Sequence, residues 1–203
     1  RPETHLRIIQ EEYEKRILTP VKPIIVNTGP CKEVIMKGEE VDLCRLPATM
    51  NMEGEDARYL GTWDLIIVKD PDSDWTNWGM YRATIHNRRT LGITLNISND
   101  GGRIFLNKFR ANNKPMPIAV VVGADPLCHM AAIADFELLE SEVNYAGGLH
   151  QEPVELVKCE TSDILVPARA EIVVEGVVLP DYVVSRNPFG EYAGYMAPPA
   201  DVP

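Results

Sequence analysis

The sequence predicts an α+β protein with a mainly antiparallel sheet. Short runs rich in β-branched and aromatic residues follow one another between residues 22 and 97, separated by Gly, Pro, Asn and Asp. Two of these runs, Gly79–His86 and Thr90–Ile97, flank Asn87-Arg-Arg as the arms of a hairpin. Helical patterns are found mainly before and after this region. Strands that follow one another in sequence pair antiparallel, which gives the predicted class.

The individual elements follow from local periodicity. Apolar residues at helical spacing predict a first helix over 3–18. The strand-like runs are then Ile24–Val26, Glu33–Met36, Val41–Cys44 and Thr62–Lys69, followed by the hairpin. The last part of the chain predicts helices near 102–113, 126–136 and 138–146, and strands Pro117–Val122 and Arg169–Leu179.

Composition excludes several classes of protein. The chain has 203 residues, of which 45% are hydrophobic and 25% charged, as in soluble globular domains. Its net charge of −10 disfavours a partner that is a nucleic acid or an anionic membrane. The sequence holds no apolar run of membrane-spanning length and no apolar signal core near its start, which predicts a cytoplasmic protein. Four cysteines without C-x-x-C spacing predict reduced, structural thiols: Cys31, Cys44, Cys128 and Cys159.

The most informative segment is Arg186–Tyr195, which contains the turn Pro188-Phe-Gly190 followed by Glu191. Proline and glycine stiffen and shape such a turn, so it can hold the Glu191 carboxylate in a fixed orientation. A carboxylate positioned in this way is a candidate proton donor. A solvated glutamate on a surface turn explains the same residues equally well.

A second cluster, Trp75–Arg82, enters a predicted strand. Asn77 offers an amide oxygen to a hard cation, Gly79 allows a ligand to approach the backbone, and Arg82 offers a planar fork to a carboxylate or phosphate. Together these groups could hold one anionic ligand. The alternative is a strand with Trp78 and Tyr81 in the core and an arginine at its edge.

A third cluster is Val157–Thr161, in which Glu160 lies between a predicted strand and a loop. One carboxylate, an asparagine oxygen and phosphate oxygens commonly hold Mg²⁺ or Mn²⁺. A solvated acid is the alternative for Glu160 alone. Glu171 and Glu175 alternate with apolar residues and indicate the polar face of a strand.

The four segments Asn77–Arg82, Val157–Thr161, Ala170–Gly176 and Pro188–Tyr195 resemble, in order and approximate spacing, motifs of the UbiD-type decarboxylases. That family uses prenylated FMN. The resemblance runs from about Val21 to Pro198 and implies an FMN-binding split β-barrel with flanking helices. It also implies a longer protein, in which residues 1–20 form a helical connector from an N-terminal part and residues 21–203 form the flavin-binding catalytic domain. A C-terminal oligomerisation domain would follow, and the absence of an initiating Met fits this expectation of a partial chain.

The resemblance also implies roles for particular residues. Asn77 and Glu160 match ligands of a divalent metal, Mn²⁺ or Mg²⁺, that bridges to the cofactor phosphate. Arg82 matches the active-site arginine, and Glu191 matches the proton donor. Cofactor contacts, with K⁺ nearby, are implied for Asn77, Trp78, Gly79, Met80, Tyr81, Arg82, Ser98 and Asn99.

Two positions depart from the family pattern. The family places a histidine as third metal ligand where this chain has Ile97–Gly102, so Asn99 or Asp100 replaces it or the metal site is altered. Arg186 stands where the family commonly has a second glutamate. Two arginines facing one pocket repel unless an anion lies between them, so Arg82 and Arg186 could clamp a substrate carboxylate, or hold Glu191 ionised. A solvent-facing Arg186 is the alternative.

The resemblance predicts nonoxidative decarboxylation, or the reverse carboxylation, of an aromatic or α,β-unsaturated acid, a hydroxylated benzoate being the first expectation. Glu191 is the expected proton donor, and Arg82 and Arg186 are the expected catalytic partners. A homo-oligomer is expected through the C-terminal domain. The alternative is a flavin-binding protein that has lost decarboxylase activity. Such a loss would also explain the two departures from the family pattern. A flavin reductase is disfavoured because nothing in the sequence indicates a nicotinamide site.

Overall fold

The computed structural model describes residues 5–186, 188–191 and 193–203, without the side chains of Ser185 and Arg186. Its α-helices are α1 (Leu6–Ile17), α2 (Asp100–Ile104), α3 (Pro126–Ala132) and α4 (Glu142–His150). A π-helical segment, Phe105–Phe109, and a 3₁₀ turn, Arg110–Asn112, continue α2. Further 3₁₀ turns are Pro30–Lys32, Gly38–Glu40 and Leu43–Arg45.

The strands in the described part of the chain form three sheets and two short ribbons. The central sheet has the order β10-β7-β3-β4, and a second has the order β2-β5-β6. The third has the order β1-β8-β9, with β1 parallel to β8, whereas the other pairings are antiparallel. The ribbons are β11-β14 and β12-β13. The strand bounds are β1 Ile24–Ile25, β2 Tyr59–Gly61, β3 Asp64–Lys69, β4 Thr76–Gly79, β5 Ala83–Asn87, β6 Thr90–Ile93, β7 Met116–Val122, β8 Glu155–Lys158, β9 Leu165–Pro167, β10 Ile172–Val178, β11 Val184–Arg186, β12 Phe189–Gly190, β13 Met196–Ala197 and β14 Ala200–Val202.

The central sheet is apolar on both faces and separates two cores. Because successive side chains of a strand point to opposite faces, Leu65 and Ile67 of β3 enter one core while Ile66 and Val68 enter the other. The first core includes residues of α3, α4, β8 and β9, and the second includes residues of β5, β6 and α2. This explains why β3 reads as a continuous apolar run rather than an alternating one.

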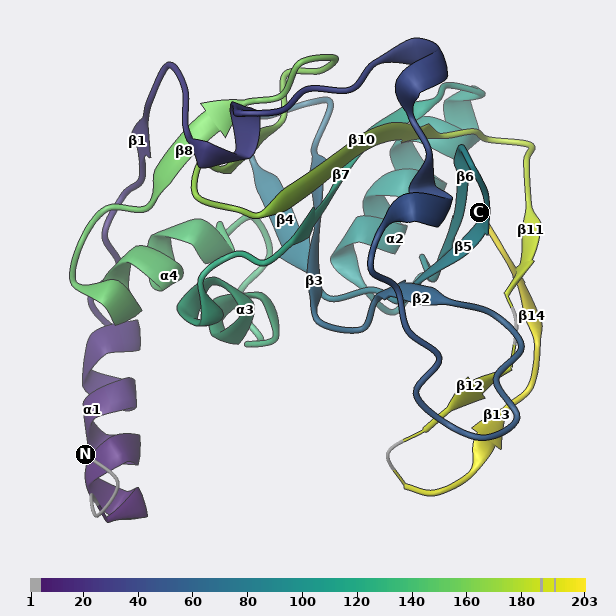
Figure 1. Ribbon diagram of the computed structural model, residues 1–203. Helices are drawn as coiled ribbons and strands as arrows, with labels where there is room; N and C mark the ends of the chain where they lie inside the picture. Colours follow the sequence, from purple (N-terminus) through teal and green to yellow (C-terminus); the bar gives the residue numbers. More distant parts are fainter. Residues whose placement is uncertain (1–4, 187, 192) are drawn as a thin grey trace.

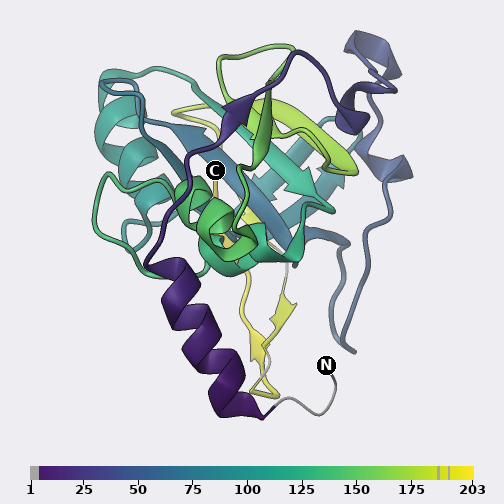
Figure 2. The ribbon, with the colours of Figure 1, turned by 90° about the vertical axis from the view of Figure 1, so that its left-hand side faces the viewer.

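The helices lie around these sheets, and two parts extend from the body. Figures 1 and 2 show α1 and the β12-β13 ribbon projecting from the rest of the chain. Charge pairs Arg7–Glu11 and Glu12–Arg16 support α1 along its exposed surface. The base of α1 contacts α4, where the Arg16 guanidinium donates to the Leu149 carbonyl at 3.1 Å. None of the α1 side chains is buried within the described residues.

Most predicted elements are confirmed. The structure contains the predicted first helix and four of the predicted strands: the one beginning at Ile24, the one in Thr62–Lys69, Pro117–Val122, and the late strand within Arg169–Leu179. β5 and β6 form the predicted hairpin, although Gly79 belongs to the preceding strand, β4. The helix expected near 102–113 is divided into α, π and 3₁₀ segments.

Two predicted strands are wrong, and two predicted helices have different bounds. Glu33–Met36 lies outside strands and helices, and Val41–Cys44 overlaps a 3₁₀ turn. Between them, Gly38 has a φ of 58°, which interrupts extended structure. The helix expected over 126–136 ends at Ala132, and the helix expected over 138–146 begins at Glu142, after Leu139 with a φ of 74°.

A buried carboxyl group lies at the start of β3. Asp64 is 1% exposed, and its Oδ2 atom has no hydrogen-bond partner among the described residues. Burial raises the pKa of Asp64 to about 7. A carboxyl with a raised pKa keeps its proton in the folded protein at a pH where the unfolded chain has lost it. Its contribution to stability is therefore present below about pH 4 and is lost as the pH rises toward 7.

We expect Asp64→Asn to remove this loss. Relative to wild type, the variant should gain free energy of unfolding as the pH rises from 5 to 8, by roughly 2–4 kcal/mol at the upper end. Urea unfolding of both proteins at the two pH values measures the difference. Asp181→Asn, at an exposed aspartate, is the matched control and should show a pH-independent difference. A constant difference for Asp64→Asn as well would contradict the prediction.

Candidate functional site

A buried carboxylate lies against Asn77. β4 places Asn77 at 4% exposure, where its Nδ2 donates to Glu142 Oε1 at 2.8 Å. The Trp78 backbone N–H donates to Glu142 Oε2 at 2.9 Å. Glu142 is in the first turn of α4 and is 6% exposed. Burial raises the pKa of Glu142 to about 7, because its described hydrogen-bond donors carry no positive charge.

The residues before and within α2 line a cavity together with Asn77 and Glu142. This cavity, of roughly 530 Å³, is lined by Ser98, Asn99 and Asp100 together with Asn77 and Glu142. The Asn99 side chain is the N-cap of α2 and accepts from the Gly102 N–H at 2.6 Å. Asp100 pairs with Arg103 at 2.9 Å. Trp78, Gly79, Met80 and Tyr81 also line the cavity, so the structure gathers these predicted cofactor contacts in one place.

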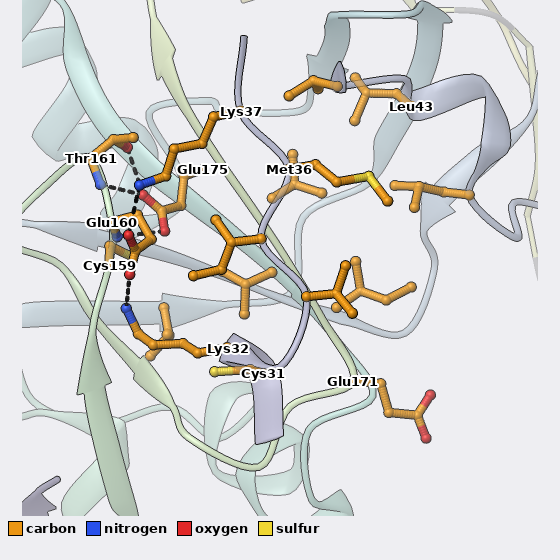
Figure 3. Close-up of a pocket in the computed structure, with 18 of the residues that line it drawn as sticks. Cys31, Lys32, Met36, Lys37, Leu43, Cys159, Glu160, Thr161, Glu171 and Glu175 are labelled. Atoms are coloured by element: carbon orange, nitrogen blue, oxygen red, sulfur yellow. Dashed lines mark hydrogen bonds and ion pairs between the residues drawn. The ribbon is translucent and has the colours of Figure 1, made fainter. Parts of the chain in front are cut away.

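The predicted metal ligand Glu160 does not join this group. Its Oε1 and Oε2 atoms form ion pairs with Lys32 at 2.5 Å and with Lys37 at 2.7 Å. Hydrogen bonds from Lys32 and then Lys37 lower the pKa of Glu160 to about 2. Its surroundings form a different cavity, of roughly 510 Å³, which is lined by the segment 31–46 and by β10 (Figure 3).

The structure therefore does not bring Asn77 and Glu160 into one site: the two residues line separate cavities, and both Glu160 oxygens are paired with lysines. The motif that contains Glu160 can be recognised in the sequence, but it does not indicate that Lys32 and Lys37 pair with this carboxylate. The carboxylate beside Asn77 is Glu142, a residue of the helix predicted near 138–146 to which the sequence motifs assign no role. The available signal was an acid in the first turn of a helix after Ser141, a frequent N-cap residue.

Arg82 and Glu191 meet although they are 109 positions apart in the chain. Arg82 Nη1 donates to Glu191 Oε1 at 2.9 Å, with side-chain exposures of 29% and 20%. The Arg82 guanidinium also lies 4.3 Å from the ring centroid of Phe189. The structure thus brings these two residues together, whereas their catalytic roles stay predictions.

The turn that carries Glu191 is anchored on both sides. Within it, the Glu191 N–H donates to the Tyr195 carbonyl at 2.8 Å, and the Gly194 N–H donates to the Glu191 carbonyl at 2.9 Å. Gly194 has a φ of 87°, which favours glycine.

Residues from an earlier part of the chain also hold this turn. The Tyr59 hydroxyl donates to the Pro188 carbonyl at 3.2 Å, and the Tyr59 ring meets the Phe189 ring edge-to-face at a centroid distance of 4.9 Å. Glu55 Oε1 accepts from the Gly190 N–H at 3.1 Å. The turn is therefore held from β2 and from the loop before it.

The Arg186 prediction lies outside the described side chains. The backbone of Arg186 is in β11, opposite Ala200 of β14. Its proposed position near the site stays a prediction.

Other features limit the chemistry of the described part of the chain. Within it, no three His, Cys, Asp or Glu side chains gather as a metal site. A cation at Glu142 would therefore need amide, backbone or ligand oxygens as well.

The four cysteines are free, as predicted, and burial raises the pKa of Cys128 and Cys159 to about 12. Over the same residues, no helix is long and apolar enough to cross a membrane.

Comparison with known proteins identifies the family of the chain. Residues 24–203 match the UbiD family model, described as the 3-octaprenyl-4-hydroxybenzoate carboxy-lyase Rift-related domain. The chain therefore belongs to the UbiD family. It is 37% identical over 180 residues to a pyrrole-2-carboxylic acid decarboxylase of Pseudomonas aeruginosa, covering 88% of this chain and 36% of that protein.

Solved structures of the same class are also similar. An evolved dimeric form of the UbiD-class enzyme HmfF from Pelotomaculum thermopropionicum, in complex with prFMN, superposes with a TM-score of 0.88 at 34% identity, covering 95% of this chain and 45% of that one. The vanillic acid decarboxylase of Sedimentibacter hydroxybenzoicus in closed form gives 0.92 at 29% identity, covering 98% and 44%. The chain thus spans less than half the length of these relatives.

Proposed function

We propose that the full-length protein is a nonoxidative carboxy-lyase that releases CO₂ from an aromatic acid with the help of prenylated FMN. The observation that carries the proposal is the Arg82–Glu191 pair, which is partly buried beside Phe189 on an anchored turn. A carboxyl group held in this way can deliver a proton to a defined position on a substrate. The relatives named as decarboxylases support this choice of reaction.

The cavity of Asn77 and Glu142 suits a cation and the cofactor phosphate. We propose Asn77 and Glu142 as two oxygen ligands of Mn²⁺ or Mg²⁺, with Asp100 or Asn99 as a third. Hard divalent cations prefer carboxylate and amide oxygens, and a cation would compensate the buried charge of Glu142. Trp78, Gly79, Met80, Tyr81 and Ser98 line the cavity and would contact the cofactor. We assign K⁺ to the backbone near the same segment.

The protein's own groups then have distinct tasks. When bound, the prenylated flavin supplies an electrophilic centre that accepts the electron pair left as CO₂ departs. Glu191 holds the proton that replaces CO₂ on the substrate carbon. Arg82 orients the Glu191 carboxyl through their hydrogen bond and offers its remaining N–H groups to the substrate carboxylate. Arg186 is proposed as a second contact with that carboxylate.

We propose that the sheets together form the flavin-binding split barrel expected from the motifs, and that a C-terminal domain mediates homo-oligomerisation. Two solved relatives are described as complexes with prFMN and with FMN, which supports the flavin site. An experimental structure of the full-length protein with flavin bound would test both points. A sheet arrangement that leaves no flavin at the Asn77 cavity would refute the first, and a monomer in light scattering would refute the second.

The decisive experiment measures CO₂ release by full-length protein reconstituted with prenylated FMN or with FMN. The panel of acids should contain hydroxylated benzoates, unsubstituted aromatic acids and pyrrole-2-carboxylate, which is named as the substrate of a relative. We expect turnover of at least one aromatic acid with the prenylated cofactor only. Flavin binding without turnover of any acid would favour the alternative, a flavin-binding protein without decarboxylase activity.

The same panel tests Arg186. If this residue contacts the substrate carboxylate, Arg186→Ala should weaken the binding of one class of acid by about 10- to 100-fold, while the protein retains its flavin. A small, uniform change across the panel would indicate a solvent-facing side chain.

A further inference from the structure

Tyr81 occupies a space that two glycines leave open. A Cβ atom on Gly79 would lie 2.2 Å from Tyr81 Cζ, and one on Gly101 would lie 2.8 Å from Tyr81 Cε2. Both distances are too short for real contacts, so the ring needs a glycine on each side. The Tyr81 ring is thus clamped between β4 and the first turn of α2.

The Tyr81 hydroxyl joins the same two elements by hydrogen bonds. It donates to Asn77 Oδ1 at 2.9 Å and accepts from the Gly101 N–H at 3.3 Å. Asn77 in turn donates through Nδ2 to Glu142 Oε1 at 2.8 Å. A chain of hydrogen bonds therefore runs from α2 through Tyr81 and Asn77 to α4.

This chain fixes the orientation of the Asn77 amide. In the structure the amide nitrogen faces Glu142 and the amide oxygen faces Tyr81. A cation shared by Asn77 and Glu142 needs the amide oxygen on the Glu142 side, because an N–H group cannot be a ligand. The amide must therefore turn over when the cation binds, and its nitrogen then needs an acceptor where the oxygen was.

We propose that Tyr81 is a positioning residue that holds the Asn77 amide in both orientations. A phenol hydroxyl donates and accepts, so it can donate to Oδ1 without the cation and accept from Nδ2 with it. A phenylalanine ring would fill the same space between the glycines but could serve neither orientation. This inference rests on the cation site of the proposed function, and it gives Tyr81 a role beyond lining the cavity.

The test measures Mn²⁺ affinity of the full-length protein by electron paramagnetic resonance of free Mn²⁺, with FMN present. Coordination through Oδ1 polarises the amide, so the bond from Nδ2–H to Tyr81 in the cation-bound state is stronger than the bond it replaces. Its loss should therefore raise the Kd of Tyr81→Phe by about 3- to 10-fold. Thermal unfolding of the variant shows whether the fold is retained. Tyr13→Phe, on α1, is the matched control and should leave the Kd unchanged.

A second background separates positioning from packing. In Asn77→Asp both side-chain oxygens are equivalent, so no amide orientation has to be held. Tyr81→Phe should therefore change the Kd of Asn77→Asp less than twofold, since the partner no longer has a wrong orientation.

The outcomes distinguish this inference from the proposed function. If wild type does not bind Mn²⁺, the cation site and the inference both fail. If wild type binds and Tyr81→Phe binds equally well, the cation site stands and the inference fails. An equal loss in the wild-type and Asn77→Asp backgrounds would make Tyr81 a packing residue and would also refute the inference.

Discussion

Glu191→Gln is expected to reduce decarboxylation by a factor on the order of 10²–10⁴ while the protein keeps its flavin. Glutamine has nearly the shape of glutamate and can still accept the hydrogen bond from Arg82, so the anchored turn should stay in place. It has no proton of suitable acidity to give to the substrate carbon. The loss should therefore fall on kcat more than on KM.

Steady-state kinetics with the best acid of the panel, together with flavin absorbance of the purified protein, measures this effect. Glu152→Gln, at an exposed glutamate, is the control and should behave as wild type. Unchanged turnover in Glu191→Gln would remove Glu191 from the mechanism. Loss of flavin in the same variant would instead give the residue a structural role.

Glu142→Gln is expected to lower Mn²⁺ affinity by on the order of 100-fold or more, because it removes the carboxylate that is hydrogen-bonded to Asn77 and proposed as a ligand. Glutamine offers one acceptor oxygen in place of two, so it can keep the hydrogen bond from Asn77 or the one from the Trp78 N–H but not both as they stand. Thermal unfolding of the variant checks that the fold is retained. Flavin retention should fall with the metal if the cation bridges to the cofactor phosphate.

Metal content and flavin absorbance of the full-length protein measure both effects, and Glu160→Gln supplies the matched comparison. Glu160 is engaged by Lys32 and Lys37 in another cavity, so its neutralisation should leave Mn²⁺ affinity unchanged. The reverse pattern, with loss in Glu160→Gln only, would restore the interpretation drawn from the motif.

The sequence predicted elements where one physical signal dominated. β3 and β7 were recognisable because strands buried on both faces are continuously apolar, and the β5-β6 hairpin because Asn87 and two arginines interrupt two strand-like runs. Val34, Ile35 and Met36 have high β propensity but form no strand, because β propensity measures a fit to a pleated surface and no strand pairs with this segment in the described structure.

The candidate site likewise contains residues that a local motif identifies and residues that only the packing of the fold brings together. Arg82 and Glu191 could be paired from motifs, since both residues lie within short, recognisable segments. Glu142 could not, because it lies in a helix with no distinctive local pattern and meets Asn77 only through the packing of α4 on β4. Glu160 was assigned from its motif, but its charge balance depends on lysines more than 120 positions away.

The anchoring of the Glu191 turn has a consequence for how specificity can change during evolution. Glu55 and Tyr59 hold this turn from positions 135 and 129 residues away, and neither needs to touch a substrate to do so. Substitutions in the loop before β2 can therefore shift the proposed proton donor, Glu191, by fractions of an ångström. If Glu191 has that role, the loop can adjust which acids are decarboxylated well without any change in the residues proposed to contact the cofactor.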